Sequence, residues 1–168
     1  LKRYFIKRPM RSDSGVLVVT VVLTPEKFSC NFDCYYCPQE TDSKGNHTQP
    51  RSYISSEPAM LRALRSNFDV RQQIWDRISA YINQGNIQLG DIPKMVLTFS
   101  GGTWESYPIE ERDRFVNESY YAFNTFGLEE DREMLSLEEE QKINETAKYR
   151  VVEFIIETRP DMINKTSL

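Results

Sequence analysis

Three short apolar runs divide the sequence, and they predict the strands of a parallel sheet. The runs are Val16 to Leu23, Met95 to Ser100 and Val151 to Ile156. The first run, VLVVTVVL, is almost continuous and rich in β-branched residues, which is typical of a strand buried on both faces. Each run ends at residues that stop a strand: Thr24-Pro25, Gly101-Gly102 and Thr158 to Pro160.

Helical patterns fill the two intervals between these runs. Residues that favour helix starts stand at four places: Ser56 to Pro58, Asp69, Pro108 and the pair Ser136 and Glu139, which form a capping box. After Asp69, apolar residues such as Ile74 and Ile78 recur at helical spacing until Gly85. The last helix is predicted to run to about Lys148.

The alternation of strands and helices predicts an α/β fold with parallel strands and right-handed crossovers. In such sheets and barrels, ligands gather at the carboxyl ends of the strands. Three polar motifs stand at these ends: three cysteines after the first run, Gly101-Gly102-Thr103 after the second, and Glu157-Thr158-Arg159 after the third. We therefore expect the three motifs to share one site.

Length and composition fit a globular chain. Of 168 residues, 39% are hydrophobic and 27% are charged, which argues against a disordered or fibrous protein. The longest apolar run is far shorter than the roughly 18 residues needed to cross a bilayer, so we expect no membrane partner. The basic start of the chain lacks the apolar core of a secretory signal, and a reducing, cytoplasmic location is expected.

The formal net charge of -4 averages over an uneven distribution. Residues 1–11 hold five basic residues, Lys7 and Arg8 among them, and no acid. We interpret residues 1–15 as a basic N-terminal arm. Such an arm can contact a polyanion such as RNA or a CoA phosphate, or it can be a solvated extension.

The only three cysteines, Cys30, Cys34 and Cys37, form a C-x3-C-x2-C motif. An odd number packed this closely is no disulfide framework, so the thiols are predicted to be ligands. Three thiolates from one loop can hold three irons of a 4Fe-4S cluster and leave the fourth iron open. The alternative is a structural zinc site that recruits His47, the only histidine, although zinc sites usually pair C-x2-C or C-x2-H units.

With Tyr36 just before its last cysteine, this motif resembles that of the radical S-adenosylmethionine enzymes. The resemblance implies that the open iron binds S-adenosylmethionine, with Tyr36 beside it. Gly101, Gly102 and Thr103 then form a close backbone approach to the cofactor, or else an ordinary turn. Glu157 and Arg159 bind cofactor hydroxyl, ammonium or carboxylate groups, or else they are a solvated strand end.

Further strings extend the resemblance to the catalytic subunit of Elongator, elongator protein three, across nearly the whole chain. They are KRPMRSDSGV (Lys7 to Val16), TQPRSY (Thr48 to Tyr53), EPAMLRALR (Glu57 to Arg65), Gly101-Gly102-Thr103 with Tyr107-Pro108, and ETRPD (Glu157 to Asp161). The compact x3 spacing between the first two cysteines differs from the longer gap of eukaryotic members of that family.

The resemblance implies a tRNA-modifying acyltransferase. A radical abstracts hydrogen from the methyl group of acetyl-CoA, and the resulting carbon radical adds to C5 of the wobble uridine, U34. Lys94 matches a lysine that contacts acetyl-CoA, whereas on its own it reads as an exposed lysine at the start of a strand. Other Elongator-type subunits become possible partners.

About three β/α units of a partial TIM barrel are predicted. Residues 16–168 are expected to form the N-terminal part of a radical S-adenosylmethionine domain, without the C-terminal half barrel and the acetyltransferase domain. The alternative is a truncated, non-catalytic relic that binds tRNA or a protein partner. Five basic residues are candidate RNA contacts in either case: Lys7, Arg8, Arg51, Arg62 and Arg65.

Overall fold

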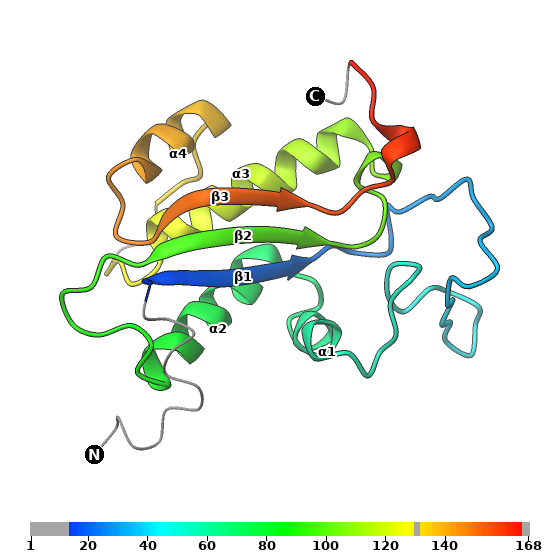
Figure 1. Ribbon diagram of the computed structural model, residues 1–168, viewed down its shortest axis with the longest axis horizontal. Coiled ribbons are helices and arrows are strands. Elements are labelled where there is room, and N and C mark those ends of the chain that lie inside the picture. Colours follow the sequence, from blue (N-terminus) through cyan, green and yellow to red (C-terminus); the bar gives the residue numbers. More distant parts are fainter. Residues whose placement is uncertain (1–13, 130–131, 166–168) are drawn as a thin grey trace.

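A computed structural model describes residues 14–129 and 132–165, and it contains one parallel sheet. The strands are β1 (Val16–Val22), β2 (Lys94–Ser100) and β3 (Arg150–Ile156), and they lie in the order β1-β2-β3 (Figure 1). All three predicted strands are therefore confirmed, as is the α/β fold. Lys7 and Arg8, with most of the predicted arm at 1–15, lie outside the described residues.

Among the residues that the structure describes, six helical segments connect the strands or follow them. They are α1 (Pro58–Arg65), α2 (Val70–Asn83), the 3-10 turn η3 (Trp104–Ser106), α3 (Ile109–Thr125), α4 (Leu137–Asn144) and the 3-10 turn η4 (Pro160–Met162). In the described part of the chain, none of the helices is long and apolar enough to cross a membrane.

Three of the predicted helix starts rest on a capping side chain, and the structure contains two of these caps. The Asp69 carboxylate accepts a hydrogen bond from the Gln72 amide, and Ser136 forms the expected capping box with Glu139. The prediction was wrong at α1, whose N-cap is Glu57, without a side-chain capping bond, and not Ser56. Helix α4 also ends at Asn144, short of the predicted Lys148.

The main core lies between one face of the sheet and helices α2 and α3. Leu17, Val19 and Val21 of β1 point to this face and are at most 3% exposed. Helix α4 packs on α3, and Figure 1 shows this helical layer behind the strands. Helix α1 packs against the carboxyl end of β1, where Val22, Met60 and Ala63 form a smaller, separate cluster.

The opposite face of the sheet is covered only in part, which corrects the prediction that β1 is buried on both faces. Val18 is 45% exposed on this face, whereas Val22, at the carboxyl end of β1, is 0% exposed beneath α1. The edge strand β3 is more open still, since Val152 is 52% and Ile155 40% exposed. A continuous apolar run is therefore compatible with a strand that buries one face only.

Candidate functional site

The carboxyl ends of the three parallel strands surround a cleft of about 590 Å³. All three cysteines line it, and so do nine other residues singled out below or by the motifs: Phe28, Phe32, Tyr36, Arg51, Tyr53, Gly102, Thr103, Glu157 and Arg159. The parallel register explains this meeting, because β1, β2 and β3 run in the same direction and end at the same edge. The three polar motifs thus lie together as expected.

The cysteine loop leaves β1 and reaches α1 without regular secondary structure. Its thiols are free and partly buried, and the Cys37 amide donates a 3.0 Å hydrogen bond to the Cys34 carbonyl, which closes a turn between them. Burial raises the pKa of the Cys37 thiol, and the nearby Arg51 guanidinium opposes that rise. Tyr36 is 85% exposed at the cleft.

The Arg51 side chain packs against the cysteine loop rather than lying on an outer surface. Its Nη1 donates a 2.8 Å hydrogen bond to the Phe32 carbonyl, and its Nη2 forms an ion pair with the Asp33 carboxylate. The Arg51 side chain is 16% exposed. The structure therefore places Arg51, a predicted RNA contact, in the cleft beside the cysteine loop.

Arg159 reaches the same loop from the opposite wall of the cleft. Its Nε and Nη2 donate to the two carboxylate oxygens of Asp161, at 3.0 and 2.8 Å. The third nitrogen, Nη1, lies 3.4 Å from Cys34 Sγ, and the guanidinium stacks 3.7 Å above the Phe32 ring centre. The bonds to Asp161 and, to a smaller extent, the contact with Cys34 raise the Arg159 pKa above its usual value, although partial burial opposes this.

The two glycines after β2 have different surroundings. A Cβ on Gly101 would lie 3.0 Å from the Tyr107 hydroxyl and 3.1 Å from Leu23, so Gly101 allows packing and does not line the cleft. Gly102 lines the cleft and has a φ of +87°, a conformation that favours glycine. Thr103 also lines the cleft and is 6% exposed.

Glu157 is positioned by β2 and by the segment before α1. Its backbone amide donates a 3.3 Å hydrogen bond to the Phe99 carbonyl, and its own carbonyl accepts a 3.1 Å hydrogen bond from the Trp104 amide. The Glu157 carboxylate accepts a hydrogen bond from the Tyr53 hydroxyl. Burial, together with this bond, raises the pKa of Tyr53, so the hydroxyl stays protonated as a donor.

The sequence patterns predicted no role for Tyr53, Phe32 or Asp33, although all three residues lie within the sequence motifs. Tyr53 ends TQPRSY, and Phe32 and Asp33 lie within the x3 gap of the cysteine motif. An aromatic and an acidic residue between two cysteines of such a motif is a usable signal. Its meaning depends on arginines more than 15 residues away, at 51 and 159.

Three predicted contacts lie away from the cleft. Lys94 is the first residue of β2, and six residue steps separate it from the carboxyl end, about 20 Å along the strand. Arg62 and Arg65 lie on α1, where Arg62 donates 3.0 Å to the Pro58 carbonyl and Arg65 is exposed. The predicted roles of these residues stay predictions.

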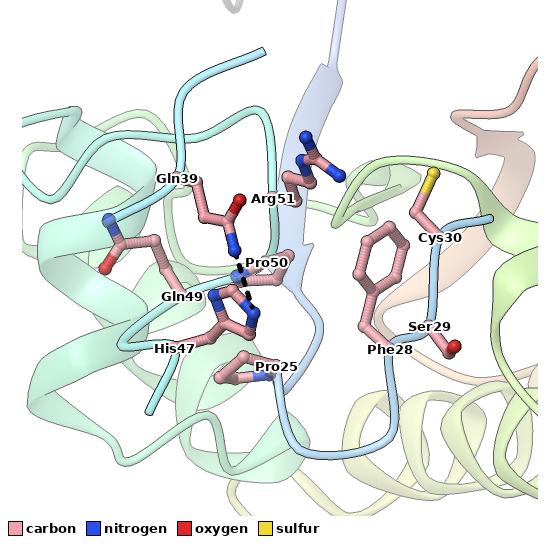
Figure 2. Close-up of a pocket in the computed structure, with 9 residues that line it drawn as sticks. All are labelled: Pro25, Phe28, Ser29, Cys30, Gln39, His47, Gln49, Pro50 and Arg51. Atoms are coloured by element: carbon pink, nitrogen blue, oxygen red, sulfur yellow. Dashed lines mark hydrogen bonds between the residues drawn. The ribbon is translucent and has the colours of Figure 1, made fainter. Parts of the chain in front are cut away.

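His47 lines a second, smaller cavity of about 200 Å³ with only one of the cysteines, Cys30. Figure 2 shows His47 and Gln39 pointing toward each other on one wall, with Phe28 between them and Cys30. Across residues 14–129 and 132–165, no three His, Cys, Asp or Glu side chains are grouped closely enough to hold a metal ion.

The donor set fits an iron-sulfur cluster in its chemistry. Three free thiols line one cleft, as a cluster with three protein ligands requires, and each iron of a cubane takes a separate thiolate. Arg51 and Arg159 also bring positive charge to the loop, which offsets the charge of three thiolates. The residues present therefore suit the group, although the thiols are not gathered around a single point.

Comparison with known proteins gives consistent matches. No family model matches the chain. A tRNA uridine(34) acetyltransferase of Methanocaldococcus infernus is 40% identical over 162 residues, which cover 96% of this chain and 28% of that protein. Elongator complex protein 3 of Saccharomyces cerevisiae is 30% identical, covering 99% of this chain and 29% of its own length.

A solved structure gives the same result in three dimensions. Archaeal Methanocaldococcus infernus Elp3 with an N-terminal deletion matches with a TM-score of 0.60 and 31% sequence identity. The match covers 91% of this chain and 25% of that one, so the chain spans roughly a quarter of the relatives it resembles. Over nearly its whole length, this chain belongs to the family of Elongator complex protein 3 and tRNA uridine(34) acetyltransferase.

Proposed function

We propose that this chain is part of a radical S-adenosylmethionine enzyme that modifies U34 of tRNA with acetyl-CoA as co-substrate. The names of its relatives support the tRNA uridine and acetyltransferase parts of this proposal. The observation that carries the rest is the single cleft in which three thiols meet the motifs that follow β2 and β3.

Cys30, Cys34 and Cys37 would hold a 4Fe-4S cluster at one wall of the cleft. When bound, the cluster supplies one electron for the reductive cleavage of S-adenosylmethionine. The cleft volume of about 590 Å³ is within the range of small-molecule sites.

The chain's own residues bind and orient the cofactor. Glu157, held by the Tyr53 hydroxyl, presents a carboxylate that accepts hydrogen bonds from ribose hydroxyls or an ammonium group. Gly102 and Thr103 offer backbone groups from the end of the neighbouring strand β2, and a Cβ on Gly102 would meet the Phe28 ring at 3.1 Å and the Arg51 carbonyl at 3.2 Å. Phe28 and Ile156 add apolar surface that reduces the access of water.

Contacts with the larger substrates are further parts of the proposal. Lys94 would bind acetyl-CoA at the other end of β2, and the exposed face of α1, with Arg65, would contact tRNA. Lys94→Ala should then weaken CoA-dependent cofactor cleavage, whereas Lys44→Ala, a change in the exposed loop at 41–47, should not. Equal CoA dependence in both variants would refute the Lys94 contact.

Anaerobic reconstitution with iron and sulfide tests the central proposal. The 168-residue chain should become brown, bind iron and sulfide, and release 5'-deoxyadenosine from S-adenosylmethionine after reduction with dithionite. Cys34→Ala should lose the cluster absorbance and the product, because only two ligands remain. Matched Ser43→Ala, in the exposed loop, should keep both. A colourless protein that holds stoichiometric zinc would overturn the proposal.

A further inference from the structure

Two arginines that are distant in sequence converge on the segment between the first two cysteines. Arg51 bonds to the Phe32 carbonyl and to the Asp33 carboxylate. The Arg159 guanidinium stacks on the ring of Phe32, and its Nη1 reaches the Cys34 sulfur. We propose that Arg51 and Arg159 are positioning residues, an arginine clamp that fixes the x3 segment and sets the charge beside the cluster.

Geometry favours a clamp over direct cofactor binding by Arg159. A guanidinium recognises a carboxylate through two parallel N–H donors. In Arg159, the fork formed by Nε and Nη2 is already taken by Asp161, and Nη1 faces Cys34. A cofactor carboxylate would be left with the end-on pair Nη1 and Nη2, where Nη1 already faces Cys34, whereas the contact with the cysteine loop uses Arg159 as it stands.

The two arginines act on different parts of the loop and so complement each other. Arg51 fixes the backbone, since it holds a carbonyl, and it is largely buried. Arg159 stacks on the ring of Phe32 and approaches the sulfur of Cys34, two residues further along, and so it orders both side chains. The turn between Cys34 and Cys37 is closed by a backbone hydrogen bond, and the Arg51 guanidinium lies close to the Cys37 thiol as well.

This clamp has two expected consequences. In the metal-free chain it should protect the amides of residues 31–37 from hydrogen exchange, since it orders a loop that lacks regular structure. In the loaded protein, positive charge near the thiolates stabilises the reduced cluster, so the clamp should raise its midpoint potential. The second consequence rests on the proposed function, and the first does not.

Hydrogen exchange followed by mass spectrometry, together with redox titration, tests both consequences on the 168-residue chain. Arg51→Gln and Arg159→Gln should each speed exchange of residues 31–37 about tenfold or more. Arg159→Lys keeps the charge but loses the fork and most of the stacking, so it should show the fast exchange with a near-parental potential. Arg65→Gln, the same change on the exposed side of α1, is the control for both readouts.

The outcomes separate the clamp from the proposed function. Parental exchange rates in both Gln variants would overturn the clamp, as would a midpoint potential that no charge-removing variant makes more negative. A chain that binds no iron but shows fast exchange in Arg51→Gln and Arg159→Gln would refute the cluster and support the positioning role. Fast exchange in the Arg65→Gln control would also count against the clamp.

Discussion

The helical layer and the cleft each contain an arginine whose fork holds a carboxylate, but the two pairs differ in their surroundings. In the helical layer, Arg132 donates to Glu140 at 2.6 and 2.7 Å, and the Glu140 side chain is 0% exposed. In the cleft, Arg159 donates to Asp161, whose side chain is 52% exposed. The same chemical motif therefore occurs once in the interior and once at a solvent-facing site.

The partners of each carboxylate show what each pair does. Glu140 also accepts hydrogen bonds from the Asn124 amide group at 2.7 Å and from the Leu135 amide at 3.1 Å, so its whole surroundings are protein. Asp161 has Arg159 as its partner, and Arg159 uses its remaining nitrogen and its face on the cysteine loop. The buried pair ties the segment between α3 and α4 to α4, and the Asn124 bond to Glu140 joins α3 to α4, whereas the exposed pair orients a guanidinium toward the cleft.

The largest expected effect is on the buried pair. Glu140→Gln should lower the free energy of unfolding by about 3 kcal/mol, because an amide would face the Arg132 guanidinium and leave that charge unpaired. Urea unfolding followed by circular dichroism measures the change. Glu138→Gln, an exposed position on the same helix, is the matched control and should stay near the parent. A similar loss in both variants would contradict a special role of burial.

The pH dependence of stability should follow from the same residue. Burial alone would raise the Glu140 pKa, but hydrogen bonds from Arg132 and Asn124 outweigh it and hold the pKa below its usual value. A carboxyl with a lowered pKa in the folded state stabilises the fold above its unfolded pKa, near 4.3, and the contribution is lost as the pH falls through the folded value. Unfolding free energies from pH 6 to pH 3 should fall less steeply in Glu140→Gln.

A smaller loss of stability is expected at the cleft glycine. Gly102→Ala should cost roughly 1 to 3 kcal/mol, because the backbone has φ +87° and the new Cβ would meet Phe28 at 3.1 Å and the Arg51 carbonyl at 3.2 Å. Gly45→Ala is a close control, since φ is +85° there but no atom lies within 4 Å. Thermal melts of both variants separate packing from backbone strain. Equal melting temperatures would mean that the cleft contacts are unimportant.

The smallest effect on global stability is expected at the exposed pair. Arg159→Gln should leave the urea midpoint near that of the parent, because Arg159 and Asp161 are both partly solvated and an exposed ion pair contributes little. The same variant should still alter the cysteine loop through Phe32 and Cys34. A midpoint shift as large as that of Glu140→Gln would show that the two pairs have the same structural role.

Local patterns predicted the elements well because each depends on neighbouring residues. Apolar runs located three strands, and the carboxylate of Asp69 and the Ser136 capping box marked two helix starts. The prediction at Ser56 failed, since Glu57 occupies the N-cap and Pro58 begins the helix without a side-chain bond. Local sequence patterns therefore locate the start of a helix to within one residue. They do not tell whether the N-cap side chain forms a capping hydrogen bond.

Burial was less predictable than secondary structure. VVEFII of β3 has the composition of a buried strand, yet Phe154, Ile155 and Ile156 are 36% to 40% exposed at the sheet edge. An apolar run indicates that burial of the strand would be favourable. How much of the strand is covered depends on the neighbouring layers.

The sequence by itself determined the order of strands and helices and the place of the three polar motifs at strand ends, because parallel strands bring their carboxyl ends to one edge. Only the tertiary structure decided which side chains meet there. Arg159 and Cys34 are 125 residues apart, and Tyr53 and Glu157 are 104 apart. Such pairs follow from packing across the sheet, for which the sequence carries no local period. The contacts of Arg51 and Arg159 with the cysteine loop therefore became visible only in the folded chain.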